Sequence, residues 1–340
     1  MDIDALNKIA NKMVERGKGI LAADESSGTI KKRFDQINTE STENNRRDYR
    51  EMLFRSDGMK HISGVILFDE TIWQNAADGT PLVKIIEKAG AVPGIKVDEG
   101  TETLAGARGA LITKGLDKLS ERLPKYYAAG ARFAKWRAVI DPAAAHVAYQ
   151  GVLANAHALA RYANLCQANN IVPIVEPEVL MDGDNDIDTC YAITQWVLKE
   201  TFQQMFYLNV ALEGIVLKPN MIVPGKKSAK KASVAEIAEK TVKCLKDCVP
   251  AAVPGIAFLS GGQSDEEATA NLNAMNAMGS QPWKLTFSYG RALQHPAIMA
   301  WAGKSANVKR AQAVFSHRAK MNGLATTGAW KAEMERELAA

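Results

Sequence analysis

The segment Leu212–Asn220 places a single lysine, Lys218, at the end of an otherwise apolar run. Side chains alternate along a strand, so Val216 and Lys218 are expected on one face of it. Pro219 has no backbone N–H to donate to a neighbouring strand, which predicts that the strand ends there. An amine that is kept partly neutral is a nucleophile toward carbonyl groups. Taken alone, however, the pattern favours a lysine that simply reaches solvent.

Charged side chains end other predicted strands in the same way. Short apolar runs predict eight strands, at Gly19–Asp24, Gly64–Glu70, Val92–Asp98, Arg132–Ile140, Ile171–Leu180, Leu212–Asn220, Gly255–Gly262 and Lys284–Arg291. The polar residues toward their ends include Asp24, Lys96, Asp98, Lys135, Arg137, Glu176 and Glu178. Each one alone is compatible with a structural ion pair or a solvated rim residue. Their convergence at one mouth by chance is improbable, so together they predict an active site.

Longer helical patterns separate these strands, including Ala143–Asn169 and Val234–Cys248. Alternation of strands and helices implies a parallel sheet with crossover helices. Eight such units without a flexible linker favour an α/β fold, a single (β/α)8 TIM barrel over residues 1–340 with a short C-terminal tail at 326–340. An amphipathic segment at Ile3–Arg16 is expected to cap the barrel. The open, doubly wound alternative lacks its dinucleotide turn, because Asp24–Gly28 has no GxGxxG spacing.

The charges of the cluster suit a lysine that forms a Schiff base with a ketone. The pKa of a lysine in a model peptide is about 10.4, and both partial desolvation and a neighbouring ammonium group lower it. Lys135 and Lys96 are expected to supply that like charge beside Lys218, while Glu176 and Glu178 offset the cluster and transfer protons. A neutral amine attacks the ketone, and the acids expel the carbinolamine hydroxyl. The protonated imine then withdraws electrons while a carbon–carbon bond breaks or forms.

Two sets of residues at strand ends predict sites for phosphate groups. The seventh and eighth strands supply Ser260, Gly261, Gly262, Ser288, Gly290 and Arg291. A glycine loop before the acidic helix start Asp265–Glu267 offers free N–H groups to phosphate, and barrels frequently bind phosphate after these strands. The second set is Ser26, Thr29, Lys96 and Arg137, with Arg33 near them. Two anion sites that flank a Schiff-base lysine suggest a sugar bisphosphate.

The overall composition argues against several other classes of protein. The net charge of +4 is mild, and the basic cluster at Lys226–Lys231 is expected to be a solvated loop, without the longer basic stripe of a nucleic-acid-binding protein. No apolar run approaches the roughly 18 residues that span a membrane. The acidic start Met1–Asp4 is not typical of a signal peptide, and the four cysteines fit no disulfide or zinc spacing. We therefore expect a cytoplasmic protein with reduced thiols.

The motifs at these strand ends closely resemble those of class I fructose-1,6-bisphosphate aldolase, the Schiff-base type. They are GKGILAADES (Gly17–Ser26), GVILFDET (Gly64–Thr71), GIKVD (Gly94–Asp98), FAKWR (Phe133–Arg137), IVPIVEPE (Ile171–Glu178), LKPNM (Leu217–Met221), FLSGGQS (Phe258–Ser264) and LTFSYGRALQ (Leu285–Gln294). The resemblance covers almost the whole chain. It implies a (β/α)8 barrel, usually a homotetramer, that needs no cofactor. The implied reaction is reversible cleavage of fructose 1,6-bisphosphate to dihydroxyacetone phosphate and glyceraldehyde 3-phosphate, in glycolysis and gluconeogenesis.

The resemblance also implies roles for individual residues. It makes Lys218 the Schiff-base nucleophile and Glu176 the main acid and base, with Lys135 assisting charge balance and proton transfer. Asp24 would orient substrate hydroxyls and assist cleavage, and Glu178 would support both lysines. The residues that correspond to the C1-phosphate site are Ser260, Gly261, Gly290 and Arg291, with Gly262 and Ser288 beside them. Those of the other phosphate end are Ser26, Thr29, Lys96 and Arg137, with Arg33 as a mobile cation of the same mouth.

One departure from the family pattern concerns the C-terminal end. Eukaryotic members usually end in a tail whose terminal tyrosine enters the active site, whereas this sequence has no tyrosine after Tyr289. We therefore expect another group or water to replace it in proton transfer, or a slower turnover. The preference for bisphosphate ketoses also stays open. The alternative is an aldolase of relaxed specificity that acts on fructose 1-phosphate or sedoheptulose bisphosphate.

Three further hypotheses compete with this one. A zinc-dependent aldolase would need ligand-spaced histidines at strand ends, and no such pair occurs among His61, His146, His157, His295 and His317, so no metal is expected. A transaldolase-like enzyme would share the lysine but need only one phosphate site. A scaffold that binds actin filaments would use the basic patch at Lys226–Lys231, although a pure scaffold has no reason to gather like charges at a barrel mouth.

Overall fold

The structure is a computed structural model that describes residues 1–107, 109–142 and 148–338. Its central strands are β1 (Gly19–Ala23), β2 (Ile62–Leu67), β3 (Val92–Lys96), β6 (Phe133–Ile140), β7 (Val172–Val179), β8 (Val216–Leu217), β9 (Gly255–Phe258) and β10 (Lys284–Tyr289). These eight strands are parallel and close into a barrel in the order β1-β10-β9-β8-β7-β6-β3-β2. The fold is therefore the (β/α)8 barrel that the strand–helix alternation predicts.

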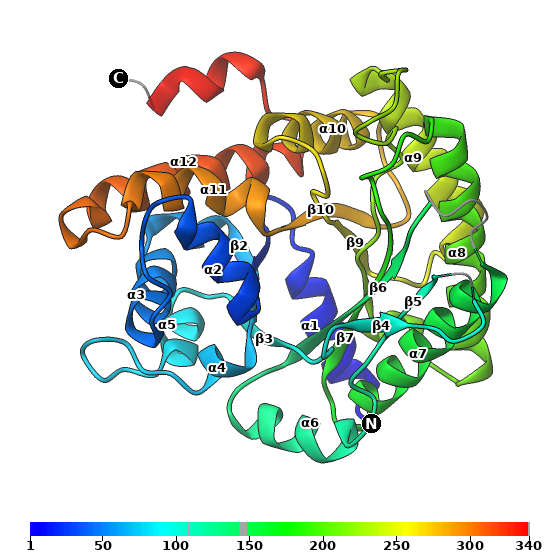
Figure 1. Cartoon of the computed structure of the whole chain (residues 1–340), viewed down its shortest axis with the longest axis horizontal. Coiled ribbons are helices and arrows are strands. Elements are labelled where there is room, and N and C mark those ends of the chain that lie inside the picture. The colour runs from blue at the N-terminus through cyan, green and yellow to red at the C-terminus, as the bar shows by residue number, and fades with distance from the viewer. Residues whose placement is uncertain (108, 143–147, 339–340) are drawn as a thin grey trace.

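Helices surround this barrel. They are α1 (Ile3–Met13), α2 (Ser27–Asp35), α3 (Glu43–Phe54), α4 (Asp69–Ile72), α5 (Leu82–Lys88), α6 (Leu119–Ala128), α7 (Tyr149–Ala168), α8 (Ile187–Tyr207), α9 (Val234–Cys248), α10 (Asp265–Ala277), α11 (Arg291–Trp301) and α12 (Val308–Ala325), with short 3-10 turns η1 (Asp57–His61), η2 (Leu212–Gly214), η3 (Ser305–Asn307) and η4 (Ala332–Leu338). In Figure 1, α10–α12 lie along the top, α3–α5 at the left and α7–α9 at the right. No helix in the described ranges is long and apolar enough to cross a membrane.

Alternation along the strands separates the barrel interior from the outer layer. On β6, Phe133 belongs to the interior cluster, whereas Ala134 and Trp136 pack with the surrounding helices. On β8, Val216 faces the interior and Leu217 the outer layer. Because side chains two residues apart share a face, Lys218 lies on the same interior face as Val216, as the sequence predicts.

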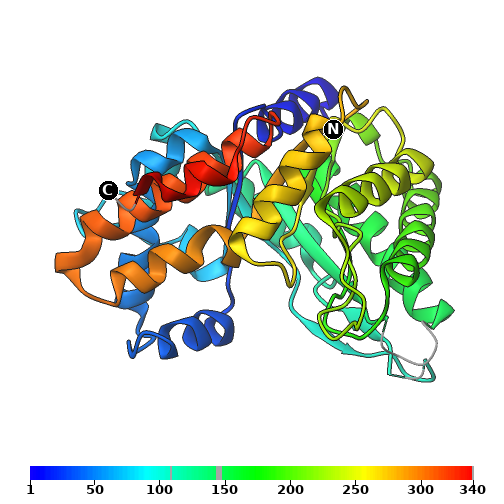
Figure 2. The ribbon, with the colours of Figure 1, turned by 90° about the horizontal axis from the view of Figure 1, so that it is seen from above.

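Helix α1 closes the end of the barrel at which the strands begin. Its face that carries Leu6, Ala10 and Met13 is buried. These side chains pack with interior residues such as Ile20 and Phe133. Figure 2 shows α1 and α2 on opposite sides of the molecule, so the plugged end and the end that carries α2 are separate. The predicted N-terminal capping helix is confirmed, although it ends at Met13 rather than Arg16.

Several predicted boundaries are wrong for local reasons. The strand predicted over Leu212–Asn220 contracts to the two residues of β8, because η2 turns the chain before it and Pro219 follows it. The second strand ends at Leu67 rather than Glu70, since Asp69 and Glu70 supply the acidic first turn of α4. The last two strands end at Phe258 and Tyr289, before the loop and the helix that follow them. The predicted helix over Ala143–Asn169 appears as α7, and residues 143–147 of that prediction lie outside the described residues.

An antiparallel hairpin between β3 and α6 was not predicted. Its strands are β4 (Thr101–Thr103) and β5 (Leu111–Thr113), and Glu102 is paired with Ile112. The side chains of β4 are exposed, so the segment has no buried apolar alternation for a sequence pattern to detect. The hairpin stands at the mouth of the barrel, where Thr101 lines a cavity.

Candidate active site

Two adjoining cavities open where the barrel strands end. They have volumes of about 760 Å³ and about 320 Å³. Both are lined by Ala22, Asp24, Arg33, Lys135, Arg137 and Gly290. The larger cavity adds Ser26, Thr29 and Lys96, and the smaller adds Glu176, Glu178, Lys218, Ser260, Gly261, Gly262, Ser288 and Arg291. The structure therefore brings every residue that the sequence singled out to one mouth.

Lys218 reaches the floor of the smaller cavity from the end of β8 and is only 4% exposed, so it does not simply extend into solvent. Its backbone N–H donates to the carbonyl of Val175 at 2.8 Å, which extends the pairing with β7 beyond β8 itself. Its Nζ lies 3.1 Å from Glu176 Oε1, and Glu176 Oε2 lies 3.5 Å from Lys135 Nζ. One buried carboxylate thus bridges two buried lysines, which places a group able to donate and accept protons beside the Lys218 amine.

Lys135 and Asp24 hold opposite charges next to this bridge. Lys135 Nζ lies 2.8 Å from Asp24 Oδ2. Burial alone would lower the pKa of Lys135, but the charges of Asp24, Glu176 and Asp98 raise it above its usual value. Burial alone would likewise raise the pKa of Asp24, but the nearby lysine charges and the hydrogen bond from Lys135 lower it to about 2. Lys135 therefore remains a cation and Asp24 an anion at neutral pH.

The loop after β9 presents free hydrogen-bond donors to the smaller cavity. The backbone N–H groups of Gly261 and Gly262 have no hydrogen-bond partner within the described part of the chain, and Gly261 adopts a φ of 52° that favours glycine. Ser288 at the end of β10 is 1% exposed, and its Oγ also lacks a partner among the described residues. Arg291 begins α11, whose N-terminus has no side-chain cap. Free donors, a helix N-terminus and a guanidinium suit a phosphate group.

The N-terminus of α10 does not contribute free donors in the way that the sequence suggested. Ser264 Oγ accepts a hydrogen bond from Glu267 N at 3.2 Å, and Ser264 N donates to Glu267 Oε2 at 2.7 Å. This capping box satisfies the first turn from within the helix. The cradle that suits a phosphate group is therefore the loop Ser260–Gly262 together with the start of α11.

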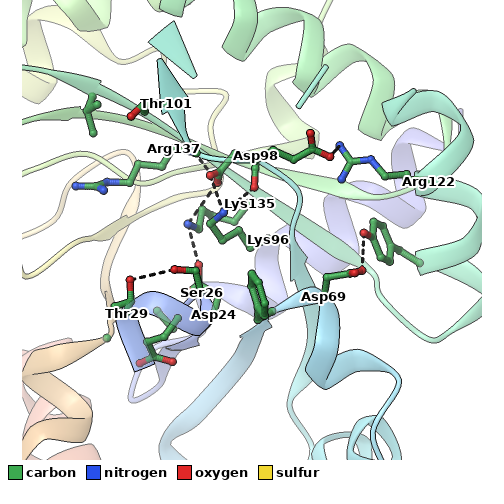
Figure 3. A pocket seen from close by; sticks show the side chains of 18 of the residues that line it. Asp24, Ser26, Thr29, Asp69, Lys96, Asp98, Thr101, Arg122, Lys135 and Arg137 are labelled. Carbon is green, nitrogen blue, oxygen red and sulfur yellow. Dashed lines mark hydrogen bonds and ion pairs between the residues drawn. The ribbon is translucent and has the colours of Figure 1, made fainter. Parts of the chain in front are cut away.

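The larger cavity carries the second set of predicted anion ligands. The hydroxyls of Ser26 and Thr29, at the start of α2, lie 3.1 Å apart. Lys96 Nζ lies 2.7 Å from Asp98 Oδ1. In Figure 3, Ser26 and Thr29 face Lys96 and Asp98 from the opposite wall, with Arg137 beside Asp98. Hydroxyls thus stand on one wall of this cavity and cations on the other, an arrangement that suits an anion.

Glu178 has a partner that the sequence did not predict. Its Oε2 forms an ion pair with Arg137 Nε across β6 and β7. Its expected support of Lys218 and Lys135 stays a prediction.

Two buried carboxylates belong to the site although no role was predicted for them. Asp98 pairs with Lys96 and lies 3.7 Å from Lys135 Nζ. Glu25 is 6% exposed, and its Oε1 lies 2.6 Å from Arg33 Nη1. The shared strand face of Lys96 and Asp98 was a usable signal for the first. No sequence pattern indicates the second, because Glu25 lines the larger cavity through contacts with Arg33 and Gln294 that only the folded chain brings together.

These parts define a class of protein. A buried lysine beside a carboxylate and a second lysine, between donor-lined cavities at the mouth of a (β/α)8 barrel, is the arrangement that a Schiff-base lyase needs. Within the described residues, His, Cys, Asp and Glu side chains form no group that could hold a metal ion.

Known proteins resemble the chain along almost its whole length. The family model described as fructose-bisphosphate aldolase class-I matches residues 5–340. A probable fructose-bisphosphate aldolase class 1 of Xanthomonas campestris pv. campestris is 53% identical over 333 residues, which cover 97% of this chain and 100% of that protein. The cytosolic fructose-bisphosphate aldolase 6 of Arabidopsis thaliana is 54% identical over 319 residues, 93% of this chain and 89% of that protein. A solved structure of fructose-bisphosphate aldolase from Plasmodium falciparum, in complex with TRAP and a small-molecule inhibitor, matches with a TM-score of 0.95 at 47% identity, covering 97% and 96% of the two chains.

The chain belongs to the class-I fructose-bisphosphate aldolase family. Its reaction is the reversible aldol cleavage of fructose 1,6-bisphosphate through a lysine Schiff base, which makes it a carbon–carbon lyase with sugar phosphates as substrates. The predictions of family, fold and reaction are confirmed, and the match favours them over the zinc-dependent and transaldolase-like hypotheses.

Proposed function

We propose that Lys218 forms the Schiff base and that its neighbours divide the proton transfers according to their contacts. Lys218 Nζ attacks the C2 carbonyl carbon of the open-chain ketose. Glu176, whose Oε1 is 3.1 Å from Nζ, protonates the carbinolamine hydroxyl, which leaves as water and yields the protonated imine. Lys135 contacts both Glu176 and Asp24, so it balances charge and assists the proton transfer. The bridge that Glu176 forms between two buried lysines is the observation that carries this proposal.

Asp24 assists the cleavage between C3 and C4. Glu176 is a carboxylate after it has protonated the leaving hydroxyl, so it accepts the proton of the C4 hydroxyl. A carbonyl then forms at C4, and the electron pair of the C3–C4 bond moves toward the imine. The aldehyde leaves and an enamine remains on Lys218. The proton held by Glu176 passes through water to C3 of the enamine, which restores the imine. Addition of water to that imine then releases dihydroxyacetone phosphate and the free lysine. Because its pKa is about 2, Asp24 is an anion that orients the substrate hydroxyls throughout.

The two cavities fit the two ends of the substrate. The C1 phosphate binds the loop Ser260–Gly262 with Ser288, Gly290 and Arg291, which line the smaller cavity together with Lys218. The other phosphate binds Ser26, Thr29, Lys96 and Arg137, with Arg33 between the two cavities. Glu178 holds Arg137 through its ion pair.

Borohydride trapping with dihydroxyacetone phosphate tests the nucleophile. We expect irreversible inactivation and a mass increase on the peptide that contains Lys218. Lys218→Arg keeps a positive charge but not the amine, so it should fold, as judged by circular dichroism, and should not be trapped. Lys227→Arg, at an exposed lysine, is the matched control and should be trapped like the parent enzyme. A label on another lysine, or an unlabelled enzyme whose activity a chelator abolishes, would contradict the proposal.

We also propose that residues 1–340 form a single domain with a short C-terminal tail at 326–340, and that this domain assembles as a homotetramer. The structure describes residues 326–338 of that tail. Two exposed aromatic side chains at the end of α8, Phe206 and Tyr207, support a subunit contact there. Light scattering after gel filtration should give four times the chain mass of 36.9 kDa, and a monomer mass would contradict the assembly.

We infer a cytoplasmic location, which the cytosolic naming of the Arabidopsis relative supports. Cell fractionation would test it directly. Binding to actin filaments through the basic patch at Lys226–Lys231 is an additional prediction. Co-sedimentation that weakens with salt would support it, and co-sedimentation that salt does not change would contradict it.

A further inference from the structure

A lysine that the sequence assigned to a solvated loop lies at the active site. The loop after β8 is joined to the loop after β7 by backbone hydrogen bonds. Lys226 N donates to the carbonyl of Met181 at 2.8 Å, and Lys227 N donates to that of Gly183 at 3.0 Å. These bonds fix the backbone of Lys226 in the wall of the smaller cavity, which its side chain also lines.

The side chain of Lys226 lies against the glycine loop that forms the phosphate cradle. A methyl group added at Gly262 would overlap Lys226 Cε, so the stem of the lysine is in contact with this loop. Nζ is one bond beyond Cε, so the amine stands beside Gly262. Its present partner is Asp182, whose Oδ1 lies 2.7 Å from Nζ. Both side chains of this ion pair are largely exposed, at 53% and 70%.

We propose that Lys226 is a further phosphate-binding residue, which exchanges Asp182 for the substrate phosphate at the loop Ser260–Gly262. This inference rests on the proposed function, since that function places the C1 phosphate at the loop. An exposed ion pair contributes little stability, so the bond to Asp182 is readily given up. A phosphate that the loop already holds carries more charge and more acceptor oxygens than one carboxylate. The exchange is therefore favourable when substrate is bound.

The same geometry assigns Asp182 an opposing role. Its carboxylate also lines the smaller cavity, so it repels an incoming phosphate and competes for Lys226. Among the described residues, neither side chain forms a hydrogen bond or ion pair with Lys218 or Glu176. The pair should therefore change how strongly a phosphorylated ketone binds, and should leave an uncharged ketone unaffected. That difference separates a phosphate ligand from a residue that merely supports the loops.

Borohydride inactivation at a series of ketone concentrations measures this difference. Each enzyme is titrated with dihydroxyacetone phosphate and, separately, with dihydroxyacetone, and the half-saturating concentration is compared. For Lys226→Met we expect the half-saturating concentration of dihydroxyacetone phosphate to rise by about threefold to tenfold. This lies between the effect of losing an exposed ion pair and that of losing a well-aligned charged hydrogen bond. The value for dihydroxyacetone should not change. Asp182→Asn should lower the half-saturating concentration of dihydroxyacetone phosphate by about twofold to threefold.

Lys227→Met is the matched control, because it removes the same charge from the next residue, which lines neither cavity. It should leave both half-saturating concentrations unchanged. An unchanged value for dihydroxyacetone phosphate in Lys226→Met would overturn the assignment. So would an equal rise for both ketones, which indicates a structural role alone. If neither ketone traps the parent enzyme, the proposed role of Lys218 is wrong, and the role of Lys226 is wrong with it. If the parent enzyme is trapped normally, the result for Lys226→Met tests the role of Lys226 alone.

Discussion

Replacing Lys135 with methionine removes the cation that Asp24, Asp98 and Glu176 share, and should destabilise the enzyme most at neutral pH. In the parent enzyme, the pKa of Asp24 is lowered from 3.8 to about 2. Because a shift of one pKa unit corresponds to about 1.4 kcal/mol, this lowering contributes about 2 kcal/mol to the free energy of unfolding. A lowered pKa stabilises the fold above pH 3.8, and this contribution is lost as the pH falls through about 2.

The variant should show the opposite dependence on pH. Burial is the largest influence on Asp24 and acts to raise its pKa, and the charge and hydrogen bond of Lys135 oppose it. Without Lys135 we expect the pKa of Asp24 to rise above its unfolded value, so the folded variant binds a proton more readily. The loss at about pH 7 should be about 2–5 kcal/mol, because buried carboxylates lose their partner. Stability should then recover as the pH falls toward about 5.

Urea unfolding followed by circular dichroism, at about pH 7 and about pH 5 and at one protein concentration, measures both effects. Lys31→Met is the control, because Lys31 and Asp35 form an exposed ion pair with side chains 63% and 55% accessible. It should change the free energy of unfolding by less than about 0.5 kcal/mol at either pH. A Lys135→Met variant as stable as the parent at neutral pH would refute this account of the charge centre. A destabilisation that does not depend on pH would refute it equally.

Two further variants test the supports of the phosphate ends. Gly261→Ala places a methyl group against Met181 at a residue whose φ is 52°. It should therefore lower the free energy of unfolding by about 1–3 kcal/mol and raise the KM for fructose 1,6-bisphosphate. A variant with an unchanged KM and an unchanged urea midpoint would contradict this. Glu25→Gln removes the buried partner of Arg33 and should raise the same KM by about threefold or more, with a smaller change in kcat. Steady-state kinetics decide the case, and a fall in kcat at constant KM would count against a role in substrate binding.

The charge cluster could be predicted from the sequence because parallel strands in a barrel end at the same side. Lys135 and Glu176 follow from this rule, since β6 and β7 are neighbours in the chain and in the barrel. The partners within the cluster could not be predicted in this way. Whether Glu178 contacts a lysine or Arg137 depends on side-chain directions that no sequence period encodes.

The position of Lys226 shows a second limit of sequence patterns. Its neighbours in the chain are basic, and a run of lysines is ordinarily a solvated surface. Only the backbone bonds between two loops bring this one residue to the cavity, and they join segments about 45 residues apart, here Lys226 and Met181. The same argument applies to Glu25, whose contact with Gln294 at 3.0 Å spans most of the chain.

The ion pairs of the site fall into two groups that serve different needs. At the centre, the side chains of Lys218 and Glu176 are 5% and 4% exposed, so their attraction is screened little by water and salt and their geometry is held for proton transfer. At the proposed phosphate ends, cations already hold carboxylates, as in Lys96 with Asp98 and Lys226 with Asp182. An incoming phosphate must displace or share these partners, so part of its attraction is offset. We therefore expect binding to be weaker than the number of cations suggests, and we expect the return of the carboxylates to their cations to aid product release.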